Sequence, residues 1–367
     1  MENTDIKTSN GFLLLSKYRG PIMGISALWI LFFHAWIPLT ENTSNVFAVF
    51  IFILERYIKR TGFCGVDIFL LLSGLGLTYA IKKETLPVFY FRRLRRLLPV
   101  FLTVAVVRTF IEHWSPAEFF GNVSGYNFYA RDIYSFLWFV TAIITLYLFF
   151  PLYYKFFISS KNQYVFTACA VLIWGVLSVA LRSIIREDMF AFTNRIPVFV
   201  TGILFGYITQ NKKQTVFKKS TYIILTVIYA AGVVLAYIYN FTPFSFILPQ
   251  GNCFLPNYLI AVSFPFLFSG LLDVISNKIP AIGKAVIAVF GFFGTLSLEL
   301  YCVQDKLMDI IPYFEYFGWP APVINISFFL VITAAAWVLS VLFKNLWEFT
   351  DRTAKKKKNG QEESSRG

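Results

Sequence analysis

The chain has little charge and almost no histidine. Only 14% of its 367 residues are Asp, Glu, Lys or Arg, and only two are histidine, His34 and His113. A soluble globular chain carries about a quarter of charged residues, so a water-soluble fold is excluded. The four cysteines form no CxxC pair and no spacing typical of metal ligands. We therefore predict no metal site, and we interpret the cysteines mainly as small apolar side chains within helices.

Apolar and aromatic residues are abundant instead. They make up 57% of the chain, which has 43 Phe and 20 Tyr and a mean hydropathy of +0.63. Several apolar runs reach the roughly 20 residues that cross a bilayer as a helix. The run at 46–54 is shorter and is interpreted as a re-entrant or interfacial segment. We predict an all-α polytopic membrane protein with about ten transmembrane helices, over 21–40, 63–81, 97–111, 135–157, 164–182, 194–210, 221–240, 255–275, 285–304 and 322–344.

The net charge of +13 could indicate a protein that binds nucleic acid. However, the basic residues lie in short blocks between apolar runs. That pattern sets the topology of membrane proteins, so we exclude nucleic acid as a partner. Most Lys and Arg fall on one side if the N-terminus is cytoplasmic, which places both termini in the cytoplasm. The predicted organisation is a cytoplasmic segment at 1–20, a transmembrane domain at 21–344, and a basic disordered cytoplasmic tail at 345–367 that touches anionic lipid.

Four ionisable residues lie within predicted spans: His34, Asp67, Arg195 and Glu299. Such residues are costly in a bilayer and indicate a functional site. The helical rise of about 1.5 Å per residue places all four between the midplane and the outer surface. Their charges can pair, which predicts a shared polar cavity. Structural pairing, interfacial anchoring or a backbone hydrogen bond would also account for each one alone. His113 is interpreted as an interfacial residue.

The second polar feature is "FYFRRLRRLLPVF", residues 89–101, with four arginines just ahead of Pro99. Positive charge on the cytoplasmic side would account for any basic residue here. Arginine, however, has a planar fork that binds phosphate through two hydrogen bonds. Residues three and four apart share one helix face, so an Arg-x-x-Arg pair can face the bundle. The pattern predicts a phosphate site formed by Arg92, Arg93, Arg95 and Arg96.

Glycines accompany Asp67 in "GFCGVDIFLLLSGLGLTYAI". Small residues let membrane helices approach closely. We therefore expect close helix packing at Gly62, Gly65, Gly74 and Gly76.

Taken together, these segments resemble acyltransferase family 3, a family of integral membrane enzymes. The resemblance rests on five segments in order. They are "ILFFH" ending at His34, "GVDIFLLLSG" at 65–74, "FRRLRRLLP" at 91–99, "LWFVTAIITLYLFFP" at 137–151 and "SLELYCVQ" at 297–304. Two positions depart from the family pattern. An arginine often stands eleven residues before the histidine, where this chain has Met23 and carries Arg19 one turn earlier. The late segment often ends in histidine, where this chain has Gln304.

The resemblance implies transfer of an acyl group, usually acetyl, from cytoplasmic acyl-CoA to a hydroxyl of a sugar or cell-surface glycan. It implies a bacterial inner or plasma membrane, with membrane lipids and the glycan acceptor as partners and acetyl-CoA as the donor. Arg92, Arg93, Arg95 and Arg96, with Arg19, would then hold the CoA phosphates.

The resemblance also implies that His34 is the general base or a transient acyl carrier, because a neutral imidazole suits both roles. Asp67 or Glu299 would orient its second nitrogen. Trp138 would stack on a sugar ring, unless it is an ordinary interfacial aromatic. Arg195 and Tyr301 are assigned to the acceptor.

Two other classes remain open from the sequence. A transporter or flippase for a lipid-linked or anionic solute would use the same intramembrane charges as a translocation path. An inactive sensor or scaffold would keep the fold without the chemistry. A transporter predicts tolerance of His34→Gln and no binding of CoA.

Overall fold

The computed structural model describes residues 11–39, 46–132, 135–180, 184, 189–211, 216–241 and 254–364, with only the backbone given for Val179, Phe254 and 349–364. Residues 1–10 of the predicted N-terminal segment, residues 40 and 181–182 of two predicted spans, and residues 365–367 of the predicted tail lie outside this description.

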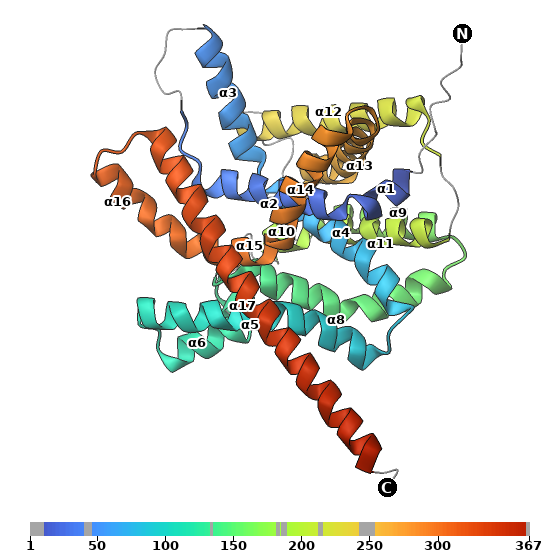
Figure 1. The fold of residues 1–367 in the computed structure, drawn as a ribbon. Helices are drawn as coiled ribbons and strands as arrows, with labels where there is room; N and C mark the ends of the chain where they lie inside the picture. Colours follow the sequence, from blue (N-terminus) through green and yellow to red (C-terminus); the bar gives the residue numbers. More distant parts are fainter. Residues whose placement is uncertain are drawn as a thin grey trace.

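All regular elements in the described residues are helices (Figure 1). The first half of the chain forms α1 (Gly11–Lys17), α2 (Arg19–Ala35), α3 (Val46–Thr61), α4 (Cys64–Ile81), α5 (Leu86–Glu112), α6 (Pro116–Val123), α7 (Tyr126–Ala130) and α8 (Trp138–Ser159). The second half forms α9 (Gln163–Ala180), α10 (Phe190–Thr193), α11 (Ile196–Gln210), α12 (Lys219–Phe241), α13 (Phe254–Lys278), α14 (Pro280–Thr295), α15 (Ser297–Leu307), the short 3-10 helix η4 (Met308–Ile310), α16 (Ile311–Tyr316) and α17 (Ala321–Ser364).

Six helical stretches in the described residues are long and apolar enough to cross a membrane. They are Cys64–Ile81, Trp138–Ser159, Phe190–Gln210, Lys219–Phe241, Leu255–Lys278 and Ala321–Glu348, and a bent pair raises the number to as many as seven. The α2 and α9 helices are apolar but shorter, and α5 carries the arginine cluster. Each of the ten predicted spans overlaps a helix, so the helical prediction is confirmed. The number of membrane crossings and the cytoplasmic side of the termini stay predictions.

The predicted span at 285–304 is not one straight helix. The chain bends by 65° where α14 ends at Thr295 and α15 begins at Ser297. A depth estimated from a constant helical rise therefore fails beyond this bend. Glu299 lies just beyond this bend, in the first turn of α15.

Glycines hold two pairs of helices in close contact. A side chain at Gly202 of α11 would place its Cβ 2.1 Å from the backbone oxygen of Leu71 in α4, and one at Gly74 of α4 would lie 2.3 Å from the oxygen of Phe199. Likewise, a Cβ on Gly294 of α14 would lie 2.1 Å from the oxygen of Gly20 in α2. The expected close approach at Gly74 is thus confirmed. These contacts fix the positions of α4 and α2.

Replacement of Gly202 by alanine is expected to lower stability by about 1–3 kcal/mol, the usual cost of overpacking a core. The added methyl group meets rigid backbone, which has no rotamer to adjust. Thermal unfolding of the purified protein in detergent measures the change. Gly175→Ala in α9 is the matched control, because a Cβ there meets nothing within 4 Å. Equal loss of stability in both variants would contradict the packing argument.

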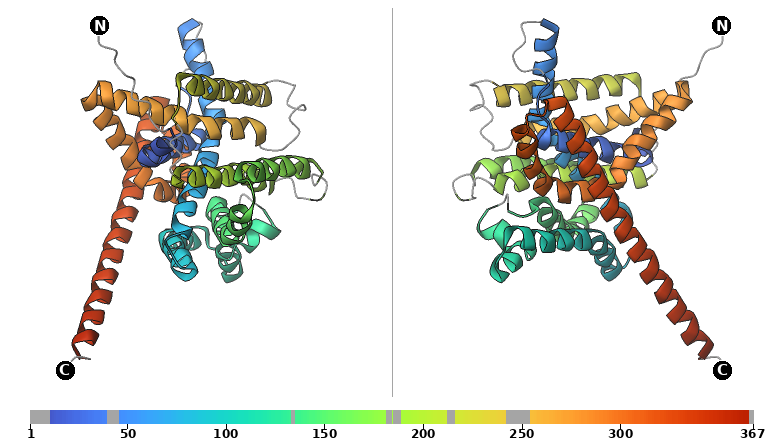
Figure 2. Two further views of the ribbon diagram at one scale, coloured as in Figure 1. Left: turned by 90° about the vertical axis from the view of Figure 1, so that its right-hand side faces the viewer. Right: turned by 60° about the vertical axis from the view of Figure 1, so that its left-hand side comes forward.

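Two helices extend beyond the packed bundle. Figure 2 shows α3 projecting from the packed helices and the later part of α17 extending beyond them in the opposite direction. The α3 helix exposes Phe47 and Phe50, and its position relative to a bilayer stays a prediction.

The predicted disordered tail also differs. The α17 backbone is helical to Ser364, because Ala, Lys, Gln and Glu in this segment are good helix formers.

The N-terminal segment packs against the bundle. Leu14 and Leu15 of α1 are buried. Asp273 of α13 accepts hydrogen bonds from Lys17 Nζ at 2.7 Å and from the Tyr18 hydroxyl at 2.9 Å. The hydrogen bond that Lys17 donates to Asp273 raises the pKa of its ammonium group. These contacts with α13 therefore help to hold the start of α2, which carries Arg19, in place.

Candidate functional site

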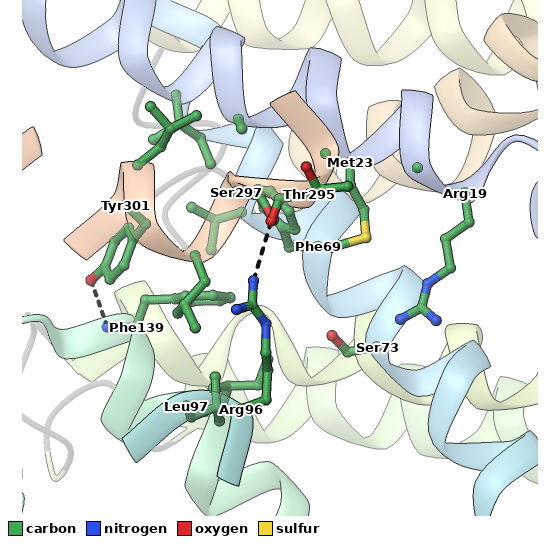
Figure 3. A pocket seen from close by; sticks show the side chains of 18 of the residues that line it. Arg19, Met23, Phe69, Ser73, Arg96, Leu97, Phe139, Thr295, Ser297 and Tyr301 are labelled. Atoms are coloured by element: carbon green, nitrogen blue, oxygen red, sulfur yellow. Dashed lines mark hydrogen bonds between the residues drawn. The ribbon is translucent and has the colours of Figure 1, made fainter. Parts of the chain in front are cut away.

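A cavity of about 480 Å³ lies between α2, α4, α5, α8 and the α14–α15 bend (Figure 3). Apolar side chains such as Met23, Phe69 and Phe139 form much of its wall. The polar groups that line it come from six helices: Arg19, Ser73, Arg96, Tyr147, Thr295, Ser297, Tyr301 and Gln304.

Two helices run along the cavity. In α15, Ser297, Tyr301 and Gln304 share one face because they are spaced by four and three residues. In α2, Met23, Ala27 and Ile30 do the same. The Gly20–Gly294 contact joins the start of α2 to the end of α14. The cavity therefore extends from Arg19 at one end to Ile30 and Gln304 at the other.

Arg19 is the cation of the first end. Its guanidinium group points into the cavity toward the side of Ser73 (Figure 3). A Cβ at Gly76 would lie 3.0 Å from its Nη2, so the glycine leaves room for the guanidinium. Within the part of the chain that the structure describes, Arg19 forms no ion pair. Met23 lines the same wall, so Arg19 presents the only cation of α2 at this end of the cavity.

A second, smaller pocket of about 230 Å³ adjoins the cavity. Its walls include Arg92, Arg93 and Glu84, and it shares Arg96, Leu97 and Tyr147 with the cavity. Three of the four predicted phosphate-binding arginines therefore meet in one place. The fourth, Arg95, faces away: its guanidinium carbon lies 4.3 Å from the ring of Trp347 in α17. We name the smaller pocket the basic vestibule.

Glu299 pairs with Arg96. Its carboxylate is fully buried and accepts two hydrogen bonds from Arg96, at 2.6 and 3.1 Å. Arg96 Nη2 also donates to the backbone oxygen of Thr295 at 3.2 Å, the contact drawn in Figure 3. The bend before Ser297 turns α15 away from the axis of α14, so the depth that Glu299 shares with His34 stays a prediction.

Asp67 and Arg195 pair with each other. Arg195 Nε lies 3.4 Å from Asp67 Oδ2, and both side chains are buried. Arg195 also donates to the backbone oxygen of Ala191 and lies 5.6 Å from the ring centroid of Trp138. None of these three predicted site residues is among the residues that line the cavity. The pairing of charges between the predicted spans is thus confirmed, but the pair sits beside the cavity.

His34 lies in the last turn of α2, one turn beyond Ile30, and its side chain is exposed. Its ring contacts the edge of Phe33 at 4.7 Å between centroids. Among the described residues, neither Asp67 nor Glu299 is hydrogen-bonded to it. His34 is not among the residues that line the cavity. The predicted role of Asp67 or Glu299 in orienting the imidazole therefore has no contact to support it.

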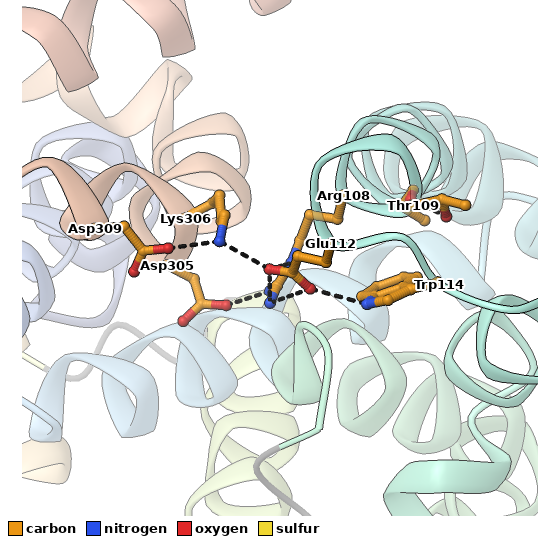
Figure 4. A network of polar contacts seen from close by, with 8 residues as sticks. Arg108, Thr109, Glu112, Trp114, Asp305, Lys306 and Asp309 are labelled. Atoms are coloured by element: carbon orange, nitrogen blue, oxygen red, sulfur yellow. Dashed lines mark hydrogen bonds and ion pairs between the residues drawn. The ribbon is translucent and has the colours of Figure 1, made fainter.

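Asp305 belongs to a charged network at this end of the molecule (Figure 4). Arg108 of α5 binds Asp305 of α15 at 2.5 Å and Glu112 at 2.8 Å, and Lys306 binds Glu112 at 3.1 Å and Asp309 at 2.5 Å. The network ties α5 to α15. Sequence reasoning missed it because its members lie near predicted helix ends, where charges are ordinary.

Tyr301 lines the cavity, as expected for a residue that contacts substrate. Its hydroxyl accepts a hydrogen bond of 3.0 Å from the backbone N–H of Phe139 (Figure 3). Phe139 follows Leu137, which has a left-handed backbone with φ of 47°. Such strain in a non-glycine residue is typical of functional sites. Ser73, Tyr147 and Gln304 were not predicted as site residues, since uncharged polar residues give a weak signal within an apolar helix.

No three His, Cys, Asp or Glu side chains in the described ranges come together as a metal ion would require. The absence of a metal stays a prediction.

Comparison with protein families gave one match. The model of the acyltransferase domain called acyltransferase family 3 matches residues 24–344. The matched segment contains all the lining residues of the vestibule, and of those of the cavity it leaves out Arg19, Gly20 and Met23. Comparison with curated proteins and with solved structures gave no match.

Proposed function

This chain belongs to acyltransferase family 3 and is a membrane acyltransferase, and we propose that it moves an acetyl group from acetyl-CoA to a hydroxyl of a sugar in a cell-surface glycan. The observation that carries the choice of donor is Arg19. Arg19 is exposed to the cavity that it lines and forms no ion pair among the described residues, so its guanidinium donors are available to a ligand. An anionic ligand such as a phosphate would pair with them.

The basic vestibule supports the same donor. Arg92, Arg93 and Arg96 present planar forks that suit phosphate groups. The vestibule shares Arg96, Leu97 and Tyr147 with the cavity. The diphosphate of CoA would bind at the vestibule, and the long pantetheine arm would extend between the helices toward the end marked by Ile30 and Gln304.

His34 is proposed as the reacting residue at that end. As general base it takes the proton of the acceptor hydroxyl, and the oxygen attacks the thioester carbonyl. The carbon–sulfur bond then breaks, and the CoA thiolate takes the proton from the imidazolium. As a nucleophile it would carry the acetyl group briefly before the same hydroxyl accepts it. Both routes give acetylated sugar and free CoA.

The other predicted residues take revised places in this proposal. Glu299 holds Arg96 within the donor site. Asp67 and Arg195 hold α4 against the start of α11. Tyr301 and Gln304 line the end of the cavity next to the acceptor. Trp138, which faces Arg195, would reach a sugar ring only if that contact opens.

The proposed setting is a bacterial inner or plasma membrane, with both termini and the basic vestibule in the cytoplasm. Lipids surround the helices, and the positive flanks of the chain fit this orientation. His34 then lies toward the opposite side, where a cell-surface glycan is available.

Release of free CoA from acetyl-CoA tests the proposal, using purified protein in nanodiscs with and without a crude glycan extract. We expect release that depends on the extract. Arg19→Gln should raise the KM for acetyl-CoA about 10- to 100-fold, the range for loss of a hydrogen bond to a charged group. Lys17→Gln is the matched control, since Lys17 binds Asp273 outside the cavity. The absence of both CoA binding and CoA release would contradict the proposal and would favour a transporter.

A further inference from the structure

We propose that Glu84 is a resident counter-ion of the basic vestibule, which an incoming phosphate must displace from Arg92 and Arg93. This inference deepens the proposed function, because it concerns the same donor site. It concerns a carboxylate that lies in the turn between α4 and α5.

The geometry of Glu84 is that of a bound anion. Its Oε1 accepts a hydrogen bond of 2.6 Å from Arg92 Nη1, and its Oε2 accepts one from Arg93 Nη1. The two oxygens thus serve two different guanidinium groups, as two oxygens of a phosphate would. The Glu84 side chain is only 10% exposed, although it belongs to a surface turn. It lines the vestibule together with both arginines.

Arg93 is held from several directions. Its Nη1 also donates to the backbone oxygen of Phe89 at 2.9 Å, and its guanidinium carbon lies 4.1 Å from the centroid of the Phe89 ring. These contacts fix the guanidinium without Glu84. Release of the carboxylate would therefore leave a guanidinium already oriented for another anion.

The charge state of Glu84 supports competition. Burial acts to raise the pKa of its carboxyl group, but the hydrogen bonds from Arg93 and Arg92 outweigh burial and hold that pKa below its ordinary value. The carboxylate is therefore ionised at neutral pH and occupies one donor of each arginine. A ligand with a single negative charge gains little by replacing it. A diphosphate carries more charge and more acceptor oxygens, so the vestibule favours a polyanion.

The experiment measures binding of two probes, CoA and inorganic pyrophosphate, to the full-length protein in nanodiscs. The variants are Glu84→Gln, which keeps the shape and removes the charge, and Glu84→Asp, which keeps the charge on a shorter side chain. Asp273→Asn is the matched control, because it removes a paired carboxylate that lies outside the vestibule. Thermal unfolding confirms that each variant is folded.

We expect Glu84→Gln to bind pyrophosphate about three- to tenfold more tightly than the wild type, a range set by the small net value of such ion pairs. Glu84→Asp should lie between the two, and Asp273→Asn should match the wild type. Acetate should bind none of them measurably. Weaker binding by Glu84→Gln would overturn the proposal, since it would mean that Glu84 positions the arginines for the ligand.

The two probes separate this inference from the proposed function. Tighter pyrophosphate binding without any CoA binding supports the counter-ion and contradicts acetyl-CoA as the donor. Absence of pyrophosphate binding in every variant overturns the counter-ion role. An equal gain in Asp273→Asn also overturns it, because the gain would then report net charge alone.

Discussion

His34→Ala is expected to lower the rate of CoA release from acetyl-CoA by about 10²- to 10⁴-fold, the contribution typical of a general base. The loss should appear in kcat, with little change in the affinity for acetyl-CoA, because the arginines proposed to bind the donor lie toward the other end of the cavity. The measurement is CoA release at saturating donor, together with direct binding of CoA.

His113 provides the control for His34. It is the other histidine of the chain and ends α5 with a left-handed backbone, φ of 54°. Asparagine tolerates this conformation better than alanine, so His113→Asn removes the imidazole with little strain. We expect this variant to keep wild-type activity. A His34→Ala variant that kept more than about a tenth of the activity would be inconsistent with a general base.

Arg96→Leu is expected to cost about 3 kcal/mol of stability, because it leaves the buried Glu299 carboxylate without its partner. The estimate is at the lower end of the range for broken buried pairs, since the Arg96 side chain itself is 50% exposed. The double variant Arg96→Leu/Glu299→Leu should regain most of this stability, as apolar replacement of buried pairs often does. It should not regain the binding of CoA.

The same helix provides the comparison for this pair. Arg92 lies one turn earlier in α5 and also binds a glutamate, but its side chain is 65% exposed. Arg92→Leu should therefore cost no more than about 1 kcal/mol. Thermal and denaturant unfolding of the three variants in one detergent gives the comparison. Equal losses for Arg92→Leu and Arg96→Leu would show that burial of Glu299 does not set the cost.

Much of the fold follows from patterns in the sequence, because a bilayer forces long apolar runs into helices. The ten predicted ranges each overlap a helix for this reason. The bend at Leu296 was not predicted, because no proline marks it in "FFGTLSLEL" and glycine is frequent in membrane helices. The continuation of α17 through 345–364 was also not predicted. Polar residues with high helix propensity extend the helix there.

The candidate site was predictable in part for a physical reason. Arginine near an apolar run is rare enough to give a signal, and Arg19, Arg92, Arg93 and Arg96 do meet at the cavity and the vestibule. The sequence does not predict which group each charged side chain contacts, because pairing depends on the rotation of the helix and on its neighbours. Asp67 faces Arg195, and Arg95 faces Trp347. Neither direction can be read from spacing along one helix.

The break between α14 and α15 brings together the negative end of one helix dipole and the positive end of the next. Arg96 binds Thr295, the last residue of α14, through its backbone oxygen, while Glu299 stands in the first turn of α15. Each charge thus stabilises the helix end of opposite sign. A ligand that draws Arg96 away would remove this compensation, so occupancy of the donor site and the 65° bend are thermodynamically linked. By reciprocity, any change that straightens the two helices must strengthen the binding of that ligand by the same free energy.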